Sequence, residues 1–354
     1  MEIKKPTLII DLQKVKNNID RMQKKIDTSI TIFRPHFKTH QLKEIGDVFK
    51  EKGINKITVS SVSMANYFAN HGWNDITIAF PINILEIDDI NTLAKKINLN
   101  VLVESVYSIS NLSDKIKYPI GIFIKVDTGY NRTGLQKDNP EIDSIIKLTM
   151  ANNKYSFKGF LAHAGHTYFA KGKSEILNIA NKSNRILNEL KQKHIVNFPD
   201  IIVSYGDTPS CSIADNFEGF DEIRPGNFTY YDVMQYHIGS CSLNEIAVTV
   251  ACPVVATHKQ RNEIIIYGGA IHLSKEFISA DNNFKLYGYV VKFTNIGWGE
   301  PIPGAYVCSL SQEHGIIKMP DNYFDDVNIG DILGVLPIHS CLTANLLIND
   351  YKLV

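Results

Sequence analysis

The stretch from Thr31 to His40, "TIFRPHFKTH", places four basic side chains in ten residues. Alternate residues of a strand face the same side, so these four are expected on one face. Neighbouring positive charge disfavours an ammonium ion, and a neutral lysine amine can form a Schiff base with a carbonyl group. The same face could also bind an anionic ligand. The alternative is that these are solvated charges at a strand end. The basic residues are Arg34, His36, Lys38 and His40.

Two further stretches combine polar side chains with turn residues. In "KVDTGYNRTG", Lys125–Gly134, a strand runs into a glycine-containing loop that can direct Arg132 towards a ligand. In "HAGHTY", His163–Tyr168, two imidazoles and a phenol lie within six residues. A turn with an incidental arginine and structural histidines are the alternatives for these two stretches.

The stretches "SYGDTPSCS", Ser204–Ser212, and "IRPGNFTYYD", Ile223–Asp232, are typical of phosphate binding in a barrel. Gly206 and Gly226 end two expected strands, where backbone N–H groups and a following helix can bind phosphate. Thr208 adds a hydroxyl group. Neither the P-loop spacing nor the dinucleotide-binding spacing is present.

In "PIHSCLTAN", His339 and Cys341 are two residues apart, so on an extended chain they face the same way. Two ligands are too few for a closed structural zinc site, but they suit an open catalytic site. A thiolate with an imidazole favours zinc over magnesium. A buried cysteine beside an unrelated histidine is the alternative.

The secondary-structure elements that must position these residues alternate regularly from about residue 30 to 230. Short β-branched runs alternate with amphipathic helical patterns, of which the longest is about 173–194. Eight such units predict a (β/α)8 TIM-like barrel, with a doubly wound open sheet as the competing architecture. The expected strands are 31–38, 56–61, 75–80, 100–105, 120–127, 158–164, 201–206 and 221–226.

After about residue 240 the pattern becomes strands without helices between them, separated by Gly, Pro and Asn-rich turns. This predicts a C-terminal antiparallel β-domain. We therefore expect a barrel domain over 1–240 and a β-domain over 241–354, with the first 15 or so residues able to pack with either. Barrels carry their chemistry at the carboxyl ends of their strands, where Lys38 and the two glycines are expected.

Composition narrows the function classes. The 354 residues carry 37 basic and 37 acidic side chains, so the formal net charge is zero. A nucleic-acid or anionic-membrane partner would require a basic excess. No apolar run approaches the roughly 20 residues of a membrane span, and the N-terminus does not read as a signal peptide. Five scattered cysteines are no disulfide framework. A cytoplasmic enzyme acting on a small molecule is expected.

Together these motifs resemble one family. The chain is similar to the fold-type III pyridoxal-phosphate enzymes, which combine an alanine-racemase-like barrel with a β-domain. It most resembles the branch of D-threonine aldolase and eukaryotic-type D-serine dehydratase. "RPHFKTH" is similar to that branch's cofactor-lysine motif, and "HSC" matches its metal pair. "QEHG" (312–315) also resembles a motif of the branch, although the sequence indicates no physical role for it. "YGGAIHLSKE" (267–276) departs from the family's usual segment at this place.

The resemblance implies a role for each matching residue. Lys38 would hold pyridoxal phosphate as a Schiff base, with Tyr168 beside it as a second catalytic residue. Arg132 would approach the phenolic oxygen of the cofactor ring. His339 and Cys341 would bind a divalent metal, zinc being favoured. The cofactor phosphate would be bound by Gly206, Thr208, Gly226 and Asn227.

The implied activity is elimination from a D-3-hydroxy amino acid, above all D-serine to pyruvate and ammonia. In this reaction the amine of Lys38 would remove the α-proton. Retro-aldol cleavage as in D-threonine aldolase is the first alternative. The His-x-Cys pair favours the dehydratase, because aldolases more often resemble His-x-Asp there. A D-3-hydroxyaspartate lyase, a racemase and a non-enzymatic cofactor-binding protein are the others. The resemblance also implies a homodimer.

Overall fold

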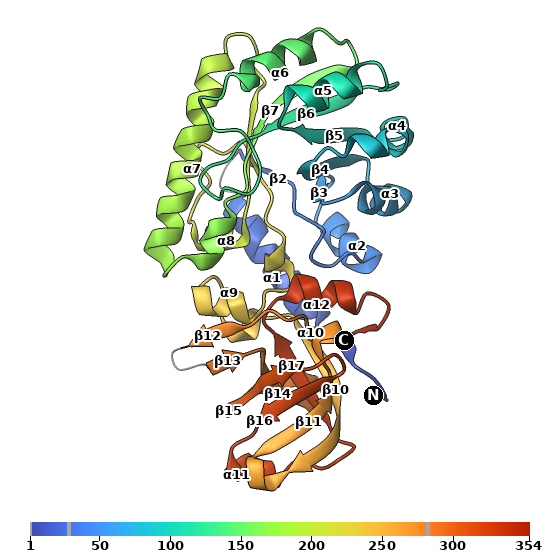
Figure 1. Cartoon of the computed structure of the whole chain (residues 1–354), viewed down its shortest axis with the longest axis vertical. Coiled ribbons are helices and arrows are strands. Elements are labelled where there is room, and N and C mark those ends of the chain that lie inside the picture. The colour runs from blue at the N-terminus through green and yellow to red at the C-terminus, as the bar shows by residue number, and fades with distance from the viewer. Residues whose placement is uncertain (1, 27–29, 281–283) are drawn as a thin grey trace. The chain divides into compact units, whose positions relative to one another are not determined.

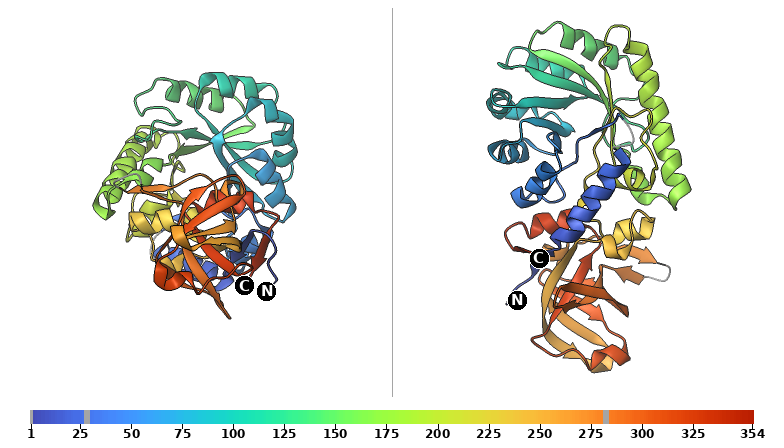
Figure 2. Two further views of the ribbon diagram at one scale, coloured as in Figure 1. Left: turned by 60° about the horizontal axis from the view of Figure 1, so that its bottom comes forward. Right: turned by 180° about the vertical axis from the view of Figure 1, so that it is seen from behind.

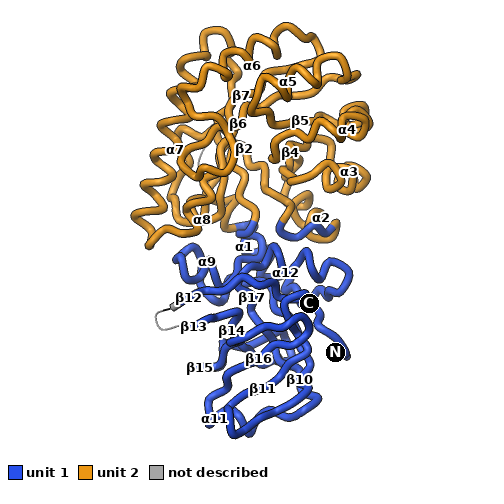
Figure 3. The backbone as a smooth tube through the Cα atoms, viewed as in Figure 1, with its two compact units in different colours: residues 1–20, 39–42, 227–354 blue, residues 21–38, 43–226 orange. Residues whose placement is uncertain are grey.

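A computed structural model of the chain describes residues 2–26, 30–280 and 284–354. The chain forms two compact units, shown in different colours in Figure 3. We call residues 21–38 and 43–226 the barrel unit, and residues 1–20, 39–42 and 227–354 the β unit. The predicted boundary at 240/241 stays a prediction about domains. The chain passes from the barrel unit to the β unit directly after Lys38 and again directly after Gly226. The predicted site residues are therefore divided between the two units.

The barrel unit contains one sheet of eight parallel strands in the order β2-β9-β8-β7-β6-β5-β4-β3. An isolated parallel bridge between His36, three residues after β2, and Thr58 of β3 links the two ends of this sheet, so the predicted barrel is confirmed. The strands are β2 (Ile32–Phe33), β3 (Ile57–Val59), β4 (Asp75–Pro81), β5 (Asn98–Val103), β6 (Ile120–Lys125), β7 (Tyr155–Leu161), β8 (Ile202–Tyr205) and β9 (Glu222–Ile223).

Helices cover the outer side of this sheet (Figure 1). The helical pattern predicted over 173–194 is confirmed as α7 (Lys173–His194), which runs along the outside of β7 and β8 (Figure 2). Inside the sheet, Leu102, Phe123 and Leu161 on adjacent strands form a buried cluster. The other helices are α2 (Lys43–Glu51), α3 (Val62–Asn70), α4 (Ile87–Ala94), α5 (Val106–Ser113), α6 (Glu141–Met150) and α8 (Thr208–Ile213), with 3-10 turns η1 (Ile84–Glu86) and η2 (Gly165–Phe169).

The first barrel strand is much shorter than the predicted 31–38. Proline has no N–H to donate to a strand ladder, and β2 ends two residues before Pro35. Beyond it, the side chain of Arg34 is buried inside the unit. Its Nε donates to the Glu222 carboxylate and its Nη1 donates to the Asp75 carboxylate, each at 2.6 Å. These two carboxylates balance the guanidinium charge, and their interactions raise the pKa of Arg34 against the opposing effect of burial.

Replacing Arg34 with methionine is expected to lower the free energy of unfolding by about 3–5 kcal/mol, because the buried Glu222 carboxylate would lose its cation. Urea unfolding followed by circular dichroism measures this change. Arg185→Met is the control, since Arg185 is exposed on α7 and its loss should shift the midpoint little. Equal midpoints for both variants would contradict a structural role for the Arg34 ion pairs.

The β unit is built on a sheet of eight strands in the order β11-β16-β15-β14-β17-β10-β1-β18, and β10 also pairs with β11. Its pairs are antiparallel except β1 with β18, so the predicted antiparallel β-domain is confirmed. The N-terminal strand lies within this sheet. The strands are β1 (Thr7–Ile10), β10 (Val248–His258), β11 (Glu263–Tyr267), β14 (Gly288–Thr294), β15 (Gly297–Leu310), β16 (His314–Lys318), β17 (Ile332–Pro337) and β18 (Tyr351–Leu353), with a separate hairpin of β12 (Ile278–Ala280) and β13 (Phe284–Leu286).

The prediction of strands without helices after residue 240 is wrong in detail, because short helices occur between the strands. They are too short to give an amphipathic period, so periodicity could not find them. The remaining helices are α1 (Leu12–Ile26), α9 (Val233–Ile238), α10 (Ala270–Leu273), α11 (Asp321–Phe324) and α12 (Ser340–Leu346), with 3-10 turns η3 (Asn227–Thr229), η4 (Leu243–Glu245) and η5 (Lys259–Arg261).

The five cysteines, all within the described residues, form no disulfide.

Candidate active site

Lys38 is held at the end of the barrel strands by its neighbour Phe37. The Phe37 N–H donates to the carbonyl of Thr58 at 2.8 Å, and its fully buried ring lies 5.0 Å from the ring centroids of Phe49 and Trp73. Lys38 itself is exposed. The buried aromatic ring therefore fixes the backbone from which the lysine amine projects.

The basic face predicted for the stretch around Lys38 is wrong. Arg34 is buried and paired with two carboxylates, as described above. His40 is fully buried, and burial lowers its pKa to about 3, so its imidazole is uncharged. The extended chain needed for strict alternation ends at Phe33, because β2 contains two residues. Neither Arg34 nor His40 is available to bind an anion as a surface cation.

Positive charge near the carboxyl ends of the strands comes from other elements. Lys125 ends β6 and is 5% exposed, with its Nζ donating to the Val126 carbonyl at 3.2 Å. Burial, together with the charges of Arg224 and Arg132, lowers the pKa of Lys125 to about 7. Two arginines from separate segments therefore act on one buried lysine here, which the linear stretch around Lys38 did not indicate.

The loop that carries Arg132 is organised by Asp127. The Oδ1 atom of Asp127 accepts hydrogen bonds from the backbone N–H groups of Gly129 and Tyr130 at 2.9 Å and of Asn131 at 3.1 Å. The Arg132 guanidinium then lies 4.9 Å from the centroid of the Tyr130 ring. The predicted turn is therefore an ordered loop that holds Arg132 against an aromatic face.

His163 belongs to the predicted "HAGHTY" stretch, from which only Tyr168 is predicted as a site residue. Its Nδ1 lies 2.6 Å from the Gly206 carbonyl, which can only accept, so Nδ1 carries the proton. Burial and the nearby charge of Lys38 lower the pKa of His163 well below its usual value. The imidazole is therefore neutral, which suits contact with a neutral or cationic ring. Its place directly after β7, at a strand end, was the available signal.

Gly206 directly follows β8 and lies against the backbone of Arg224, which directly follows β9. A Cβ atom at this position would lie 2.8 Å from the Arg224 carbonyl carbon, so only glycine fits without a shift. The next residue, Asp207, caps α8: its Oδ1 accepts from the Ser210 N–H at 2.7 Å and from the Thr167 hydroxyl at 3.0 Å. These bonds tie the turn η2 to the beginning of α8.

Two predicted site residues directly follow Thr167 and Asp207, the two residues joined by this hydrogen bond. Tyr168 lies in η2 after Thr167, and Thr208 is the first residue of α8 after Asp207. Gly226 follows β9 in the chain. With the exposed Lys38 and the neutral His163, the barrel unit holds a lysine amine, an aromatic contact and a tight glycine turn. These are the groups that pyridoxal phosphate needs, so the residues fit that cofactor.

The other predicted residues, Asn227, His339 and Cys341, belong to the β unit. His339 and Cys341 do not lie on an extended chain as predicted. β17 ends at Pro337, His339 precedes α12, and Cys341 lies in the first turn of that helix. Burial disfavours the imidazolium, but hydrogen bonds with Cys341 and Glu276 outweigh it and raise the pKa of His339 to about 11. The imidazole and the thiol therefore interact directly despite the change in backbone.

The sulfur of Cys341 is buried among polar side chains. The Thr39 hydroxyl lies 3.2 Å from Sγ, and Nδ2 of Asn227 donates to it at 3.5 Å. The same Nδ2 donates to the Asp232 carboxylate at 2.6 Å, and this carboxylate accepts from the Ser340 N–H at 3.0 Å. The Asn227 amide therefore contacts the thiol, and the phosphate contact of Asn227 stays a prediction.

A thiol and an imidazole in hydrogen-bonding contact form a donor set that suits zinc. Among residues 2–26, 30–280 and 284–354, no group of three or more His, Cys, Asp or Glu side chains could hold a metal ion. His339 and Cys341 alone would supply two protein ligands, which would fit an open metal site whose other positions belong to water and substrate.

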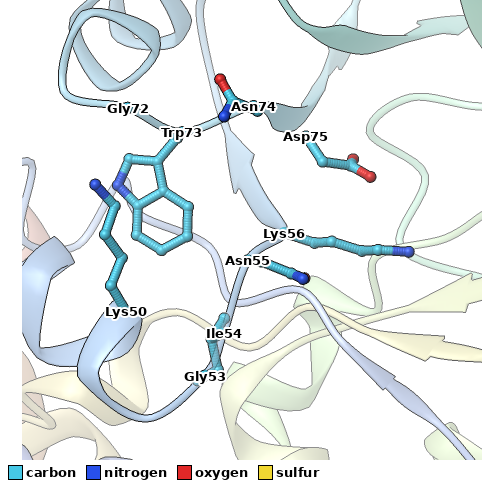
Figure 4. A pocket seen from close by; sticks show the side chains of 9 residues that line it. All are labelled: Lys50, Gly53, Ile54, Asn55, Lys56, Gly72, Trp73, Asn74 and Asp75. Atoms are coloured by element: carbon cyan, nitrogen blue, oxygen red, sulfur yellow. The ribbon is translucent and has the colours of Figure 1, made fainter.

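A separate pocket lies in the barrel unit at the amino ends of β3 and β4 (Figure 4). Its lining includes Lys50, Trp73 and Asp75. None of the predicted site residues lines it. In a (β/α)8 barrel this end of the strands serves stability, whereas catalysis occurs at the carboxyl ends.

In the described part of the chain, no helix is both long enough and apolar enough to span a bilayer.

Comparisons with known proteins agree with this arrangement. The family model for the alanine racemase N-terminal domain matches residues 10–233, and a serine dehydratase domain model matches residues 247–351. The D-serine dehydratase of Dictyostelium discoideum is 30% identical, over 99% of this chain and 93% of that protein. The D-threo-3-hydroxyaspartate dehydratase of Delftia sp. is 25% identical, over 96% of this chain and 91% of that protein.

Among solved structures, an alanine-racemase-like protein from Idiomarina loihiensis superposes with a TM-score of 0.87. It is 26% identical, and the match covers 98% of this chain and 92% of that one. The predicted resemblance is therefore confirmed along the whole length. The chain belongs to the fold-type III pyridoxal-phosphate family, and within it to the lyases of the D-serine dehydratase and D-threonine aldolase type.

Proposed function

We propose that this lyase is a zinc-dependent D-serine dehydratase, which converts D-serine to pyruvate and ammonia. The observation that carries the proposal is the contact between the imidazole of His339 and the thiol of Cys341. Such a soft donor pair favours zinc, and zinc can activate the hydroxyl group that an elimination must expel. The full-length similarity to a D-serine dehydratase supports the same reaction.

Each group of residues has a role in this reaction. When bound, pyridoxal phosphate supplies an electron sink for the substrate α-carbon, and zinc supplies a Lewis acid for the β-hydroxyl. Lys38 would hold the cofactor and, once released, its amine would take the α-proton. Gly206, Thr208 and Gly226 would bind the phosphate. His163, kept neutral with its proton on Nδ1, would contact the cofactor ring without adding charge.

D-threo-3-hydroxyaspartate is the second candidate substrate. It undergoes the same elimination but carries one more carboxylate. The exposed Arg132, which lies close enough to lower the pKa of Lys125, favours this candidate, since its charge could attract an additional anion. The similarity to the Delftia enzyme supports it too.

Product analysis tests the proposal. The protein, loaded with pyridoxal phosphate and zinc, is incubated separately with D-serine, L-serine, D-threonine and D-threo-3-hydroxyaspartate. We expect equal amounts of pyruvate and ammonia from D-serine, and a rate with L-serine that is lower by orders of magnitude. The assay measures 2-oxo acid and ammonia in parallel with glycine and aldehyde.

Other outcomes would replace the proposed activity. Glycine and acetaldehyde from D-threonine would identify an aldolase. A much faster release of oxaloacetate from the hydroxyaspartate would identify the second substrate. Interconversion of D- and L-amino acids that survives chelation would identify a racemase. The cytoplasmic location and the homodimer expected from the sequence stay predictions.

A further inference from the structure

Glu276 is a carboxylate beside the proposed metal pair that the proposed function does not use. Its Oε2 atom lies 2.8 Å from Nδ1 of His339. Both residues belong to the β unit. A carboxylate that accepts the Nδ1–H of an imidazole leaves Nε2 as the nitrogen that a metal ion can bind, with release of the Nε2 proton.

The segment that carries Glu276 is held by the turn between β15 and β16. The N–H groups of Gly268 and Ala270 donate to the carbonyls of Glu313 and Ser311 at 3.0 and 2.8 Å. A Cβ atom on Gly269 would lie 2.3 Å from the Gln312 carbonyl oxygen, so this close approach requires glycine. The turn thus gives a structural role to "QEHG" and to the "YGG" segment, for which the sequence offered no explanation.

From this anchor the chain leads through α10 to Glu276. The Ser274 N–H donates to the Ala270 carbonyl at 2.9 Å, and the Ser274 hydroxyl accepts from the Glu276 N–H at 3.3 Å. The Thr343 hydroxyl of α12 donates to the Leu273 carbonyl at 3.4 Å. Because α12 follows His339 directly, these bonds fix both ends of the contact between the carboxylate and the imidazole.

We propose that Glu276 is a positioning residue for the metal ligand His339. Its carboxylate holds the proton on Nδ1 and orients the ring so that Nε2 faces the metal. Because its Oε2 atom is engaged with Nδ1 of His339, Glu276 acts through this histidine rather than as a third ligand. The inference rests on the proposed function, since it requires a metal on His339 and Cys341.

The test compares Glu276→Gln and Glu276→Asp with wild-type protein, all loaded with pyridoxal phosphate. Zinc affinity is measured by competition with a chelating dye. Visible absorption of the cobalt-substituted protein reports the ligand geometry. We expect Glu276→Gln to weaken zinc binding by about 10–100-fold and to alter the cobalt bands. Glu276→Asp should restore part of the loss. The absorption of the bound cofactor and the unfolding midpoint should stay the same.

Glu313→Gln is the matched control. Glu313 lies in the turn between β15 and β16, and its carboxylate is 3.9 Å from Nε2 of a different histidine, His272. Loss of the Glu313 carboxylate should therefore leave zinc affinity unchanged. Wild-type zinc affinity and cobalt bands in Glu276→Gln would overturn the inference while leaving the metal pair intact. A wild-type protein that takes up no zinc would instead contradict the metal site of the proposed function, and the inference with it.

Discussion

Replacing Lys38 with alanine is expected to remove the visible absorption of bound pyridoxal phosphate and to reduce D-serine turnover by at least about 10³-fold. The variant loses both the amine that forms the Schiff base and the base that takes the α-proton. Absorption spectra after gel filtration measure the first effect, and the pyruvate assay measures the second. Lys38→Arg should fail equally, because a guanidinium is neither a nucleophile nor a base at neutral pH.

Lys125 is the lysine that competes with Lys38 for this role. Its pKa of about 7 leaves much of its amine neutral, but it is 5% exposed and already donates to a backbone carbonyl. Borohydride reduction of the wild-type protein, followed by peptide mass analysis, should therefore locate the cofactor on the peptide that contains Lys38. The control Lys43→Ala removes a nearby exposed lysine and should keep both absorption and turnover. Cofactor on the Lys125 peptide would transfer the proposed role to that residue.

The features that followed from the sequence are those with local signals. Eight β-branched runs alternating with helical patterns predict the parallel barrel, and the long helix over 173–194 has a period that only a helix gives. Candidate residues at strand ends follow from the rule that barrels carry chemistry there. This rule predicts Lys38, Gly206 and Gly226 as site residues from their positions in the sequence alone.

The features that did not follow from the sequence depend on partners far apart in the chain. Arg34 is neutralised by Glu222, which is 188 residues away, and nothing near Arg34 indicates that pairing. Glu276 contacts His339 across 63 residues. α12 has seven residues, too few for a helical period, so an extended chain was expected around Cys341. In each case tertiary packing determined the environment of a polar side chain.

Replacing Cys341 with alanine is expected to remove zinc while pyridoxal phosphate stays bound. One imidazole alone is a weak ligand set, and the Thr39 hydroxyl and Asn227 amide near the sulfur are poor substitutes for a thiolate. Lewis-acid activation of a leaving group is worth several kcal/mol, so D-serine turnover should fall by about 10²–10³-fold. Zinc content after dialysis, the absorption of the bound cofactor and the pyruvate assay measure the three effects separately.

Two further variants decide whether the loss comes from the ligand. Cys308→Ala removes a half-buried thiol from β15 and should change neither zinc content nor turnover. Cys341→Asp replaces the soft ligand with a hard one, so it should bind zinc more weakly and favour manganese or magnesium relative to wild type. Full activity and full zinc content in Cys341→Ala would show that the thiol is not a metal ligand. Loss of the cofactor together with the metal would show instead that Cys341 supports the fold around Asn227 and Ser340, because the Asp232 network joins these residues.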